Sequence, residues 1–230
     1  MVYCFYKTQK EELFLKNYRF LLFDLDGTLI YSHEGIFSCI RHTLRAKNLP
    51  EPPDALLKKC VGPPLTYAFS HFFGMTEEDA VDATRIYREE YARTGVWQNA
   101  LIPGACKALE TFQKAGFTLA LATSKPKHFA QKILDRWELS HFFEAVVGPY
   151  EGNLETKAEV IQEALRITGA NGENCLMIGD RKHDLEGANA NGIDCAIVLT
   201  GYAEADEFER VSPKYILSSF EELTKTILSK

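Results

Sequence analysis

Short apolar runs recur along the chain and are separated by longer segments whose apolar residues have helical spacing. Runs this short and continuous are typical of strands buried on both faces of a parallel sheet. The predicted strands are residues 20–25, 117–122, 144–147, 175–178, 195–199 and 215–217. Between them, Phe129, Ile133 and Leu134 have helical spacing, and Thr156 and Glu159 form a capping-box pattern. This alternation predicts an α/β fold with a doubly wound, mostly parallel sheet.

One long stretch interrupts the alternation. About ninety residues separate the first two predicted strands, which is too many for a loop between a strand and a helix. This stretch has apolar residues at helical spacing from Ile36 to Leu44, a turn-rich segment at 50–54, and two further helical patterns that end near Arg93. We therefore predict a helical cap subdomain at 33–98, inserted into an α/β core. The core would comprise residues 18–32 and 99–230, preceded by a charged N-terminal leader at 1–17.

Composition and charge narrow the class of protein. The chain has 230 residues, 46% of them apolar, and 26 Lys and Arg against 32 Asp and Glu give a net charge of −6. A negative balance argues against a nucleic-acid partner but leaves room for a small phosphorylated ligand. No apolar run is long enough to cross a membrane, and charged residues interrupt the N-terminal runs as they would not in a signal peptide. We expect a cytoplasmic protein that is a monomer or homodimer and binds neither nucleic acid nor membrane.

The six cysteines are scattered singly, without the close pairs that a zinc site requires. Cys106, Cys175 and Cys195 stand in apolar stretches. They are expected to be small buried hydrophobic residues in a reducing compartment.

Candidate chemistry gathers where the predicted strands end. Asp24 and Asp26 follow the first strand, Thr123 follows the second, and Asp180 and Asp184 follow the fourth. The carboxyl ends of parallel strands meet at one edge of a sheet, which is where ligands bind in such folds. Four carboxylates at one edge repel one another unless a cation lies among them, and hard oxygen ligands suit Mg²⁺.

Other residues at this edge suit a phosphate group. The turns at Gly27 and Thr28 and at Thr123 and Ser124 offer backbone N–H groups and hydroxyls to phosphate oxygens. Lys157 stands in the first turn of a predicted helix, where the helix dipole disfavours a cation unless an anion lies nearby. These features indicate that the ligand is a small phosphorylated metabolite.

Four motifs in order resemble those of the haloacid-dehalogenase superfamily. Residues 24–29, Asp-Leu-Asp-Gly-Thr-Leu, look like its first signature. Thr123, Lys157 and the pair Asp180 and Asp184 fall where its second, third and fourth motifs are expected. The chain looks most like the phosphoglycolate-phosphatase-like branch, to which it is similar at residues 61–65, 103–104 and 122–126. The resemblance covers nearly the whole chain after about Tyr18 and implies a Rossmann-like core with a helical cap.

The resemblance also implies a role for each residue. Asp24 would be the nucleophile that forms an aspartyl-phosphate, and its ordinary pKa near 3.9 would leave it ionised at pH 7. Asp26 would protonate the leaving alcohol and then take a proton from water. Asp24, the Asp26 backbone carbonyl and Asp180 would hold Mg²⁺, while Asp184 would orient Lys157 or a metal-bound water. The groups on the phosphate or substrate would be Gly27, Thr28, Thr123, Ser124, Lys125 and Lys157.

Simpler roles remain open for several residues. Thr123 could cap the helix after Pro126, Lys157 could be a solvated surface lysine, and Asp180 with Asp184 could be turn and cap residues. His33 and His183 are expected to be an ordinary hinge and loop residue, and Lys125 and Arg181 could line the mouth of the site. Ser124 stands where many relatives have Asn, and Tyr31 stands near a position often occupied by Asp.

We therefore expect a Mg²⁺-dependent phosphatase that hydrolyses a phosphoglycolate-like, nucleotide or sugar phosphate through a phospho-aspartate. The closest alternative is a sugar-phosphate mutase, which returns the phosphoryl group to its substrate. A metal-free haloacid dehalogenase would have no use for Asp26 as an acid or for further carboxylates around a cation. A phospho-receiver or a silent binding protein would need neither a large cap nor the complete set of motif residues.

Overall fold

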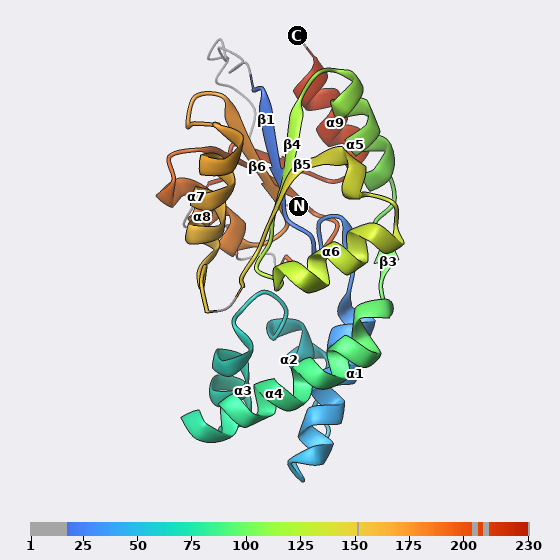
Figure 1. The fold of residues 1–230 in the computed structure, drawn as a ribbon, viewed down its shortest axis with the longest axis vertical. Helices are drawn as coiled ribbons and strands as arrows, with labels where there is room; N and C mark the ends of the chain where they lie inside the picture. The colour runs from blue at the N-terminus through green and yellow to red at the C-terminus, as the bar shows by residue number, and fades with distance from the viewer. Residues whose placement is uncertain (1–17, 151, 204–206, 209–211, 230) are drawn as a thin grey trace, which may run out of the picture.

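In the computed structural model, which describes residues 18–150, 152–203, 207–208 and 212–229, a six-stranded parallel sheet forms the centre of the molecule (Figure 1). The strand order is β5-β4-β1-β6-β7-β8. The strands are β1 (Phe20–Phe23), β4 (Thr118–Ala122), β5 (Phe143–Val147), β6 (Cys175–Gly179), β7 (Asp194–Val198) and β8 (Tyr215–Leu217). The predicted α/β fold is confirmed, and the proposed leader, residues 1–17, lies outside the described residues.

The register of the sheet aligns the ends of its central strands. Phe23, the last residue of β1, pairs with Leu121 of β4 on one side and Ile178 of β6 on the other. The three strands are parallel, so the residues that follow them leave the sheet at the same edge. This edge faces the cap helices in Figure 1.

Helices cover both faces of the sheet, and alternate strand residues supply the two apolar clusters beneath them. Leu22 of β1 packs with α7 (Lys157–Thr168) and α8 (Lys182–Ala190), while Leu21 and Phe23 face the opposite side. That side is covered by α5 (Ala105–Lys114), α6 (Lys127–Arg136) and α9 (Phe220–Leu228). Both faces of β1 are therefore buried, as its uninterrupted apolar sequence predicts.

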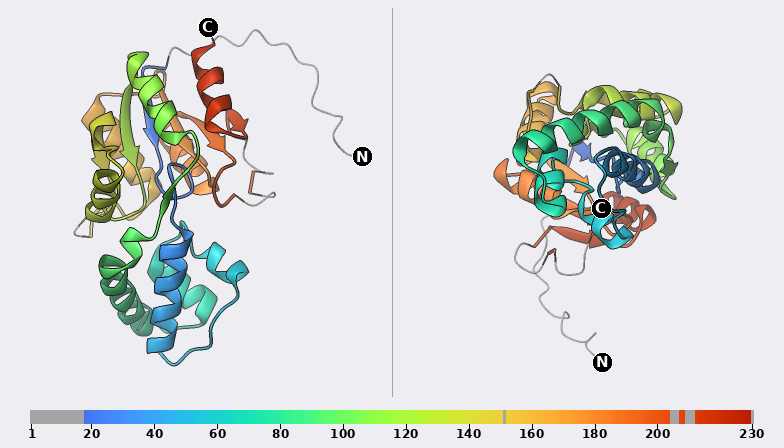
Figure 2. Two further views of the ribbon diagram at one scale, coloured as in Figure 1. Left: turned by 90° about the vertical axis from the view of Figure 1, so that its right-hand side faces the viewer. Right: turned by 90° about the horizontal axis from the view of Figure 1, so that it is seen from below.

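A helical layer, here called the cap, lies beyond the carboxyl edge of the sheet (Figures 1 and 2). It comprises α1 (His33–Ala46), α2 (Asp54–Lys59), α3 (Leu65–Phe73), α4 (Glu77–Arg93) and the 3₁₀ turn η1 (Gly95–Trp97). At its base, β2 (Ile30–Tyr31) pairs antiparallel with β3 (Ala100–Leu101). These two strands were not among those predicted, because strands of two residues are too short to give a periodic signal.

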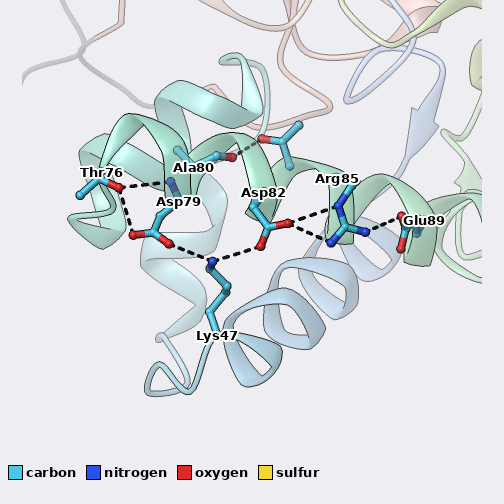
Figure 3. Close-up of polar contacts among 8 residues, drawn as sticks. Lys47, Thr76, Asp79, Ala80, Asp82, Arg85 and Glu89 are labelled. Carbon is cyan, nitrogen blue, oxygen red and sulfur yellow. Dashed lines mark hydrogen bonds and ion pairs between the residues drawn. The ribbon is translucent and has the colours of Figure 1, made fainter.

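The ends of α1 and α4 are joined by a polar network on the cap (Figure 3). Lys47, which follows α1, contacts Asp79 at 2.9 Å and Asp82 at 3.1 Å, both on α4. Thr76 caps α4 by accepting a hydrogen bond from the backbone N–H of Asp79 at 3.1 Å. These contacts connect the end of α1 to the first turns of α4, the cap helix that carries a residue reaching the core.

The cysteines differ in their burial. Cys175 and Cys195 are buried, but Cys106 is exposed because the buried face of α5 is formed by Ala105, Ala108, Leu109 and Phe112. Cys106 was therefore wrongly expected in the core. Among the described residues, no helix is both long and apolar enough to span a membrane.

Candidate functional site

Three strand ends bring the predicted acidic residues together. Asp24 follows β1 directly, and its backbone N–H donates to the Ile178 carbonyl of β6 at 2.9 Å. Asp180 follows β6, and Asp184 lies one turn later in α8. One carboxylate oxygen from each of Asp24, Asp180 and Asp184 lies within 4.8 Å of the others, and all three residues are buried. We call these three side chains the acidic group.

Lys157 is in direct contact with two members of the acidic group. Its Nζ lies 2.6 Å from Asp24 Oδ1 and 2.8 Å from Asp184 Oδ1, and its side chain is only 6% exposed. The alternative that Lys157 is a solvated surface lysine is therefore wrong. The two carboxylates provide the negative charge that offsets its position in the first turn of α7.

Local sequence sets the place of Lys157. Thr156 is the N-cap of α7: its hydroxyl accepts from the Glu159 backbone N–H at 3.2 Å, and the Glu159 carboxylate accepts from the Thr156 backbone N–H at 2.9 Å. The predicted capping box is confirmed. The N-cap lies one residue before Lys157, the first residue of the helix, so the capping box holds the turn from which the Lys157 side chain enters the site.

Burial dominates the electrostatics of the acidic group. It raises the pKa of Asp24 to about 7, with Lys157 acting against the shift and Asp184 adding to it. Burial, reinforced by Asp184 and Asp24, also raises the pKa of Asp180 well above its ordinary value. For Lys157 burial lowers the pKa, but the two carboxylates outweigh it and raise the pKa above the ordinary value. The expectation that its ordinary pKa leaves Asp24 ionised at pH 7 is therefore wrong for the metal-free site. A further cation beside Asp24 would lower this pKa and favour the ionised form.

Asp180 is held in place by the loops around it. Its Oδ2 accepts from the Tyr202 backbone N–H at 2.7 Å, and the Thr28 hydroxyl donates to its Oδ1 at 3.4 Å. A Cβ at Gly27 would lie 2.2 Å from Asp180 Oδ2, and one at Gly201 would lie 2.1 Å from the same atom. The two turns can approach the Asp180 carboxylate this closely only because each has a glycine at the point of contact.

Asp184 uses both of its carboxylate oxygens within the protein. Oδ1 contacts Lys157, and Oδ2 accepts from the backbone N–H groups of Asp180 and Arg181, each at 3.1 Å. The expected role in orienting Lys157 and the alternative role at the start of α8 are therefore both compatible with its contacts. Asp180 also accepts on both of its oxygens, whereas the described contact of Asp24 is through Oδ1.

A second ion pair lies beside the acidic group. Lys125 Nζ lies 3.0 Å from Asp26 Oδ2 and donates to the Tyr91 hydroxyl at 2.9 Å. Asp26 Oδ1 is buried and has no hydrogen-bond partner within the described part of the chain. Lys125 thus links an acidic residue of the core to a tyrosine of the cap.

The other predicted residues occupy different surroundings. Thr123 is buried, and its hydroxyl accepts from the Lys125 backbone N–H at 3.1 Å; it does not cap α6, whose N-cap is Pro126. Ser124 is exposed. The guanidinium of Arg181 donates to the Val61 carbonyl of the cap at 2.9 Å and pairs with Glu207 at 2.6 Å, so it contacts protein groups.

Sequence reasoning missed two tyrosines at this site. Tyr91 contacts Lys125, and Tyr202 contacts Asp180 through its backbone while its hydroxyl accepts from the Ser32 N–H at 3.0 Å. The helical spacing of the segment that contains Tyr91 predicts only a buried face. Tyr202 lies in a loop without a local signal, so neither contact could be found before the fold was known.

The residues present fit a divalent cation. Three buried carboxylates lie close together against one contacting lysine, and all of the side-chain donors are hard oxygens. Burying that much negative charge without a compensating cation is costly, which agrees with the raised pKa values of Asp24 and Asp180. Asp24 and Asp180 would supply side-chain ligands, and the Asp26 backbone carbonyl remains a prediction.

Comparisons with known proteins agree with this geometry. The family model described as haloacid dehalogenase-like hydrolase matches residues 21–198. A 5'-nucleotidase from Pseudomonas aeruginosa is 37% identical over 210 residues, which cover 91% of this chain and 95% of that protein. The tyrosine-protein kinase PtkA of Mycobacterium tuberculosis is 37% identical over 194 residues, which cover 84% of this chain and 66% of that protein.

Two further matches are a curated protein and a solved structure. A phosphoglycolate phosphatase from Aquifex aeolicus is 30% identical over 209 residues, covering 90% of this chain and 95% of that protein. The crystal structure of a predicted phosphatase from Clostridium acetobutylicum superposes with a TM-score of 0.88 and 35% identity. It covers 93% of this chain and 99% of that one.

Proposed function

Because this chain belongs to the haloacid dehalogenase-like hydrolase family, we propose that it is a Mg²⁺-dependent phosphatase that hydrolyses small phosphorylated metabolites through a phospho-aspartate on Asp24. Family membership and the phosphatase relatives confirm the expected superfamily, fold and enzyme class, a hydrolase of phosphoric monoesters. The proposal adds three things to the enzyme class: the metal ion, the covalent intermediate and the kind of substrate.

One observation carries the proposal: Asp24 lies at the end of the central strand, against Lys157 and within reach of Asp180. A carboxylate oxygen there can attack phosphorus in line as the bond to the leaving oxygen breaks. Lys157 contacts Asp24 at 2.6 Å and would also lie beside the phosphoryl oxygens, where its charge offsets theirs. Mg²⁺, when bound, would supply further positive charge that keeps Asp24 ionised and reduces its repulsion from the phosphate dianion.

Asp26 is the residue proposed to move protons. It lies two residues after the nucleophile, and its Oδ1 is buried without a partner within the described residues. We propose that Oδ1 gives a proton to the leaving oxygen and takes one from the attacking water. Thr123 is buried at the end of β4, the neighbouring strand, and is proposed to donate its hydroxyl to the transferred phosphoryl group. The Gly27 backbone N–H donates to the Ile30 carbonyl at 2.8 Å, so the prediction that it binds phosphate is not carried further. The backbone N–H groups of Thr28 and Ser124 are proposed to bind the remaining oxygens.

The substrate class rests on the family and its members. Two of the relatives named above act, by their names, on nucleotides and on phosphoglycolate. We propose a small phosphomonoester of this kind for the present chain. Selection among such esters belongs to the cap, whose residues lie over the carboxyl edge of the sheet.

The experiment is a phosphate-release assay over nucleoside monophosphates, sugar phosphates, phosphoglycolate and pyrophosphate, with Mg²⁺ and with EDTA. Asp24→Asn removes the nucleophile and should abolish turnover of every ester that the wild type hydrolyses. Asp54→Asn, an exposed cap residue, is the matched control and should retain full activity. Turnover that persists in EDTA, or full activity in Asp24→Asn, would contradict the mechanism.

Asp26→Ala tests the proton transfers separately. General acid–base groups contribute about 10²–10⁴-fold in rate, so both formation and hydrolysis of the phospho-enzyme should slow by about that factor. Rapid-quench measurement of both steps checks this. Unchanged rates for the two steps would remove Asp26 from the chemistry while leaving Asp24 in place.

The likeness to a tyrosine-protein kinase makes transfer to an acceptor other than water the second candidate. The sugar-phosphate mutase is the case in which the acceptor is the substrate. Both share the proposed phospho-enzyme. Adding a tyrosine peptide or a sugar phosphate to labelled phospho-enzyme and measuring how the label divides between acceptor and inorganic phosphate distinguishes them from a phosphatase.

A further inference from the structure

The cap contributes a hydroxyl group to the interior of the site. Tyr91 of α4 is buried, and its hydroxyl accepts a hydrogen bond from Lys125 Nζ at 2.9 Å. The same ammonium lies 4.7 Å from the centre of the Tyr91 ring. Lys125 belongs to the core, in the turn after β4, so this contact joins the two parts of the molecule at the site.

Aromatic packing fixes where the Tyr91 hydroxyl lies. Its ring stacks on Tyr87, with centroids 5.6 Å apart and planes at 12°, and meets the edge of Phe129 at 5.1 Å and 75°. Tyr87 belongs to the same cap helix, whereas Phe129 belongs to α6 of the core. Tyr91 is therefore held from both sides, and little rotational freedom is left for its hydroxyl.

Lys125 passes this constraint to Asp26. Its Nζ contacts Asp26 Oδ2 at 3.0 Å, and its side chain is only 6% exposed, so water competes little for either contact. An oxygen that accepts from an ammonium is the less basic of the two, so a proton is held preferentially on the other oxygen. The other oxygen, Oδ1, is buried and has no partner among the residues that the structure describes.

We propose that Tyr91 is a positioning residue that holds Lys125 on Oδ2 of Asp26 and so leaves Oδ1 as the oxygen that gives and takes the proton. The inference rests on the proposed function of Asp26. In the first step the Oδ1–H proton goes to the leaving oxygen as its bond to phosphorus breaks and the Asp24–phosphorus bond forms. In the second, Oδ1 takes a proton from the water that attacks phosphorus, and the Asp24–phosphorus bond breaks.

The contacts from Tyr91 to Asp26 cross from the cap to the core. Tyr91 is in the cap and Asp26 in the core, so the chain of contacts is complete only when the cap lies against the core as it does here. Proton transfer would then be efficient only with the cap in this position, which excludes water from the site before the leaving group departs.

The test compares Tyr91→Phe with wild type on two leaving groups. The variant keeps the ring and its packing but loses the hydroxyl. For phosphoglycolate, whose leaving alkoxide needs a proton, we expect the rate of phospho-enzyme formation to fall about tenfold, a part of the usual acid–base contribution, with KM nearly unchanged. For 4-nitrophenyl phosphate, whose leaving group needs no acid, formation should stay close to wild type. If phosphoglycolate is not turned over, the best alkyl phosphate from the panel replaces it.

Tyr87→Phe is the matched control, because it removes a hydroxyl from the neighbouring ring of the same buried stack and should leave both rates unchanged. Lys125→Met should reproduce the leaving-group dependence, and adding Tyr91→Phe to it should cause no further loss. Melting temperatures establish that each variant is folded.

The two proposals fail in different ways. A wild type that releases phosphate from no ester overturns the proposed function and this inference with it. A wild type that is active and Mg²⁺-dependent, with Tyr91→Phe slowing both leaving groups equally or neither, overturns the positioning role alone. Additive losses in the Tyr91→Phe and Lys125→Met double variant would do the same, because they would show that the two residues act independently.

Discussion

Gly27 shows how tightly the site depends on single residues. Its φ of +84° is in the left-handed region, and a Cβ there would lie 2.2 Å from Asp180 Oδ2. Gly27→Ala should therefore both strain the backbone and displace a proposed metal ligand. A displacement of about 1 Å can cost about 10²-fold in rate, so we expect kcat to fall by about that factor and Mg²⁺ affinity to fall with it.

The chain offers a close control for this change. Gly116 has a φ of +88°, and a Cβ added there would meet no atom within 4 Å. Gly116→Ala should lose about 1–2 kcal/mol of stability from the left-handed backbone alone, with no change in kcat. Thermal unfolding, kcat and calorimetric titration with Mg²⁺ compare the two. Equal effects of both variants on kcat would mean that the contact with Asp180 is irrelevant.

At the residue scale, the positions of the charged site residues were easier to predict from the sequence than the residues they contact. Asp24, Lys157 and Asp180 could be found because chemically unusual residues follow buried strands or open a helix. Tyr91 could not, because an aromatic residue on the apolar face of a helix is ordinary until its neighbours are known. The same applies to Cys106, since helical phase decides which residues of α5 face the core.

At the scale of elements, continuous apolar runs were sufficient to locate the sheet. All six predicted strands exist, with ends shifted by a few residues at most. The pattern missed α2 in the proline-rich stretch and the short pair β2 and β3. Six helical residues and two-residue strands are held by tertiary packing, so they leave little periodicity in the sequence. The bounds proposed for the cap remain a prediction.

The N-cap of α7 links an element to the chemistry. Thr156→Ala removes the cap hydrogen bond and should cost about 1 kcal/mol, or about 2–4 °C in Tm for a chain of this size. Because Lys157 is the first residue of this helix, fraying of the turn should also loosen its contact with Asp24. We therefore expect kcat to fall several-fold at a temperature where the variant is fully folded.

Ser219→Ala is the matched change at another helix. Ser219 caps α9 by accepting from the Glu222 backbone N–H at 3.2 Å, the same type of contact on a helix that carries none of the site residues. It should lose a similar amount of stability and retain wild-type kcat. Equal kcat in the two variants would contradict the proposed link between the α7 cap and Lys157.

At the scale of the whole molecule, the fold concentrates charge that the sequence distributes. The net charge of −6 is spread over 230 residues, but three carboxylates meet within 4.8 Å at the end of β1. Strand order could not be derived from the apolar pattern, although the parallel arrangement already implied that the strand ends meet. The stability of the molecule should therefore depend on how this one cluster is charged.

The direction of that dependence follows from the pKa of Asp24. Its ordinary value is 3.8, and burial raises it to about 7 in the folded, metal-free protein. Between these values the folded state holds a proton that the unfolded state has released. The contribution of Asp24 to stability therefore falls as pH rises through this window and levels off above about pH 7. The raised pKa of Asp180 acts in the same direction.

We expect the Tm of the metal-free protein to fall from pH 5 to pH 8 more steeply than that of Asp24→Asn, which cannot ionise at this position. Each kcal/mol of the difference corresponds to about 2–4 °C. Mg²⁺ should raise Tm more at pH 8 than at pH 5, because it binds the ionised folded state and stabilises it by mass action. His128 and His183, whose pKa values burial lowers, are common to both proteins and cancel in the comparison.

Scanning calorimetry of the two proteins, each in EDTA and in excess Mg²⁺, measures these four cases. Parallel pH profiles for wild type and Asp24→Asn in EDTA would contradict the raised pKa of Asp24 in the folded protein.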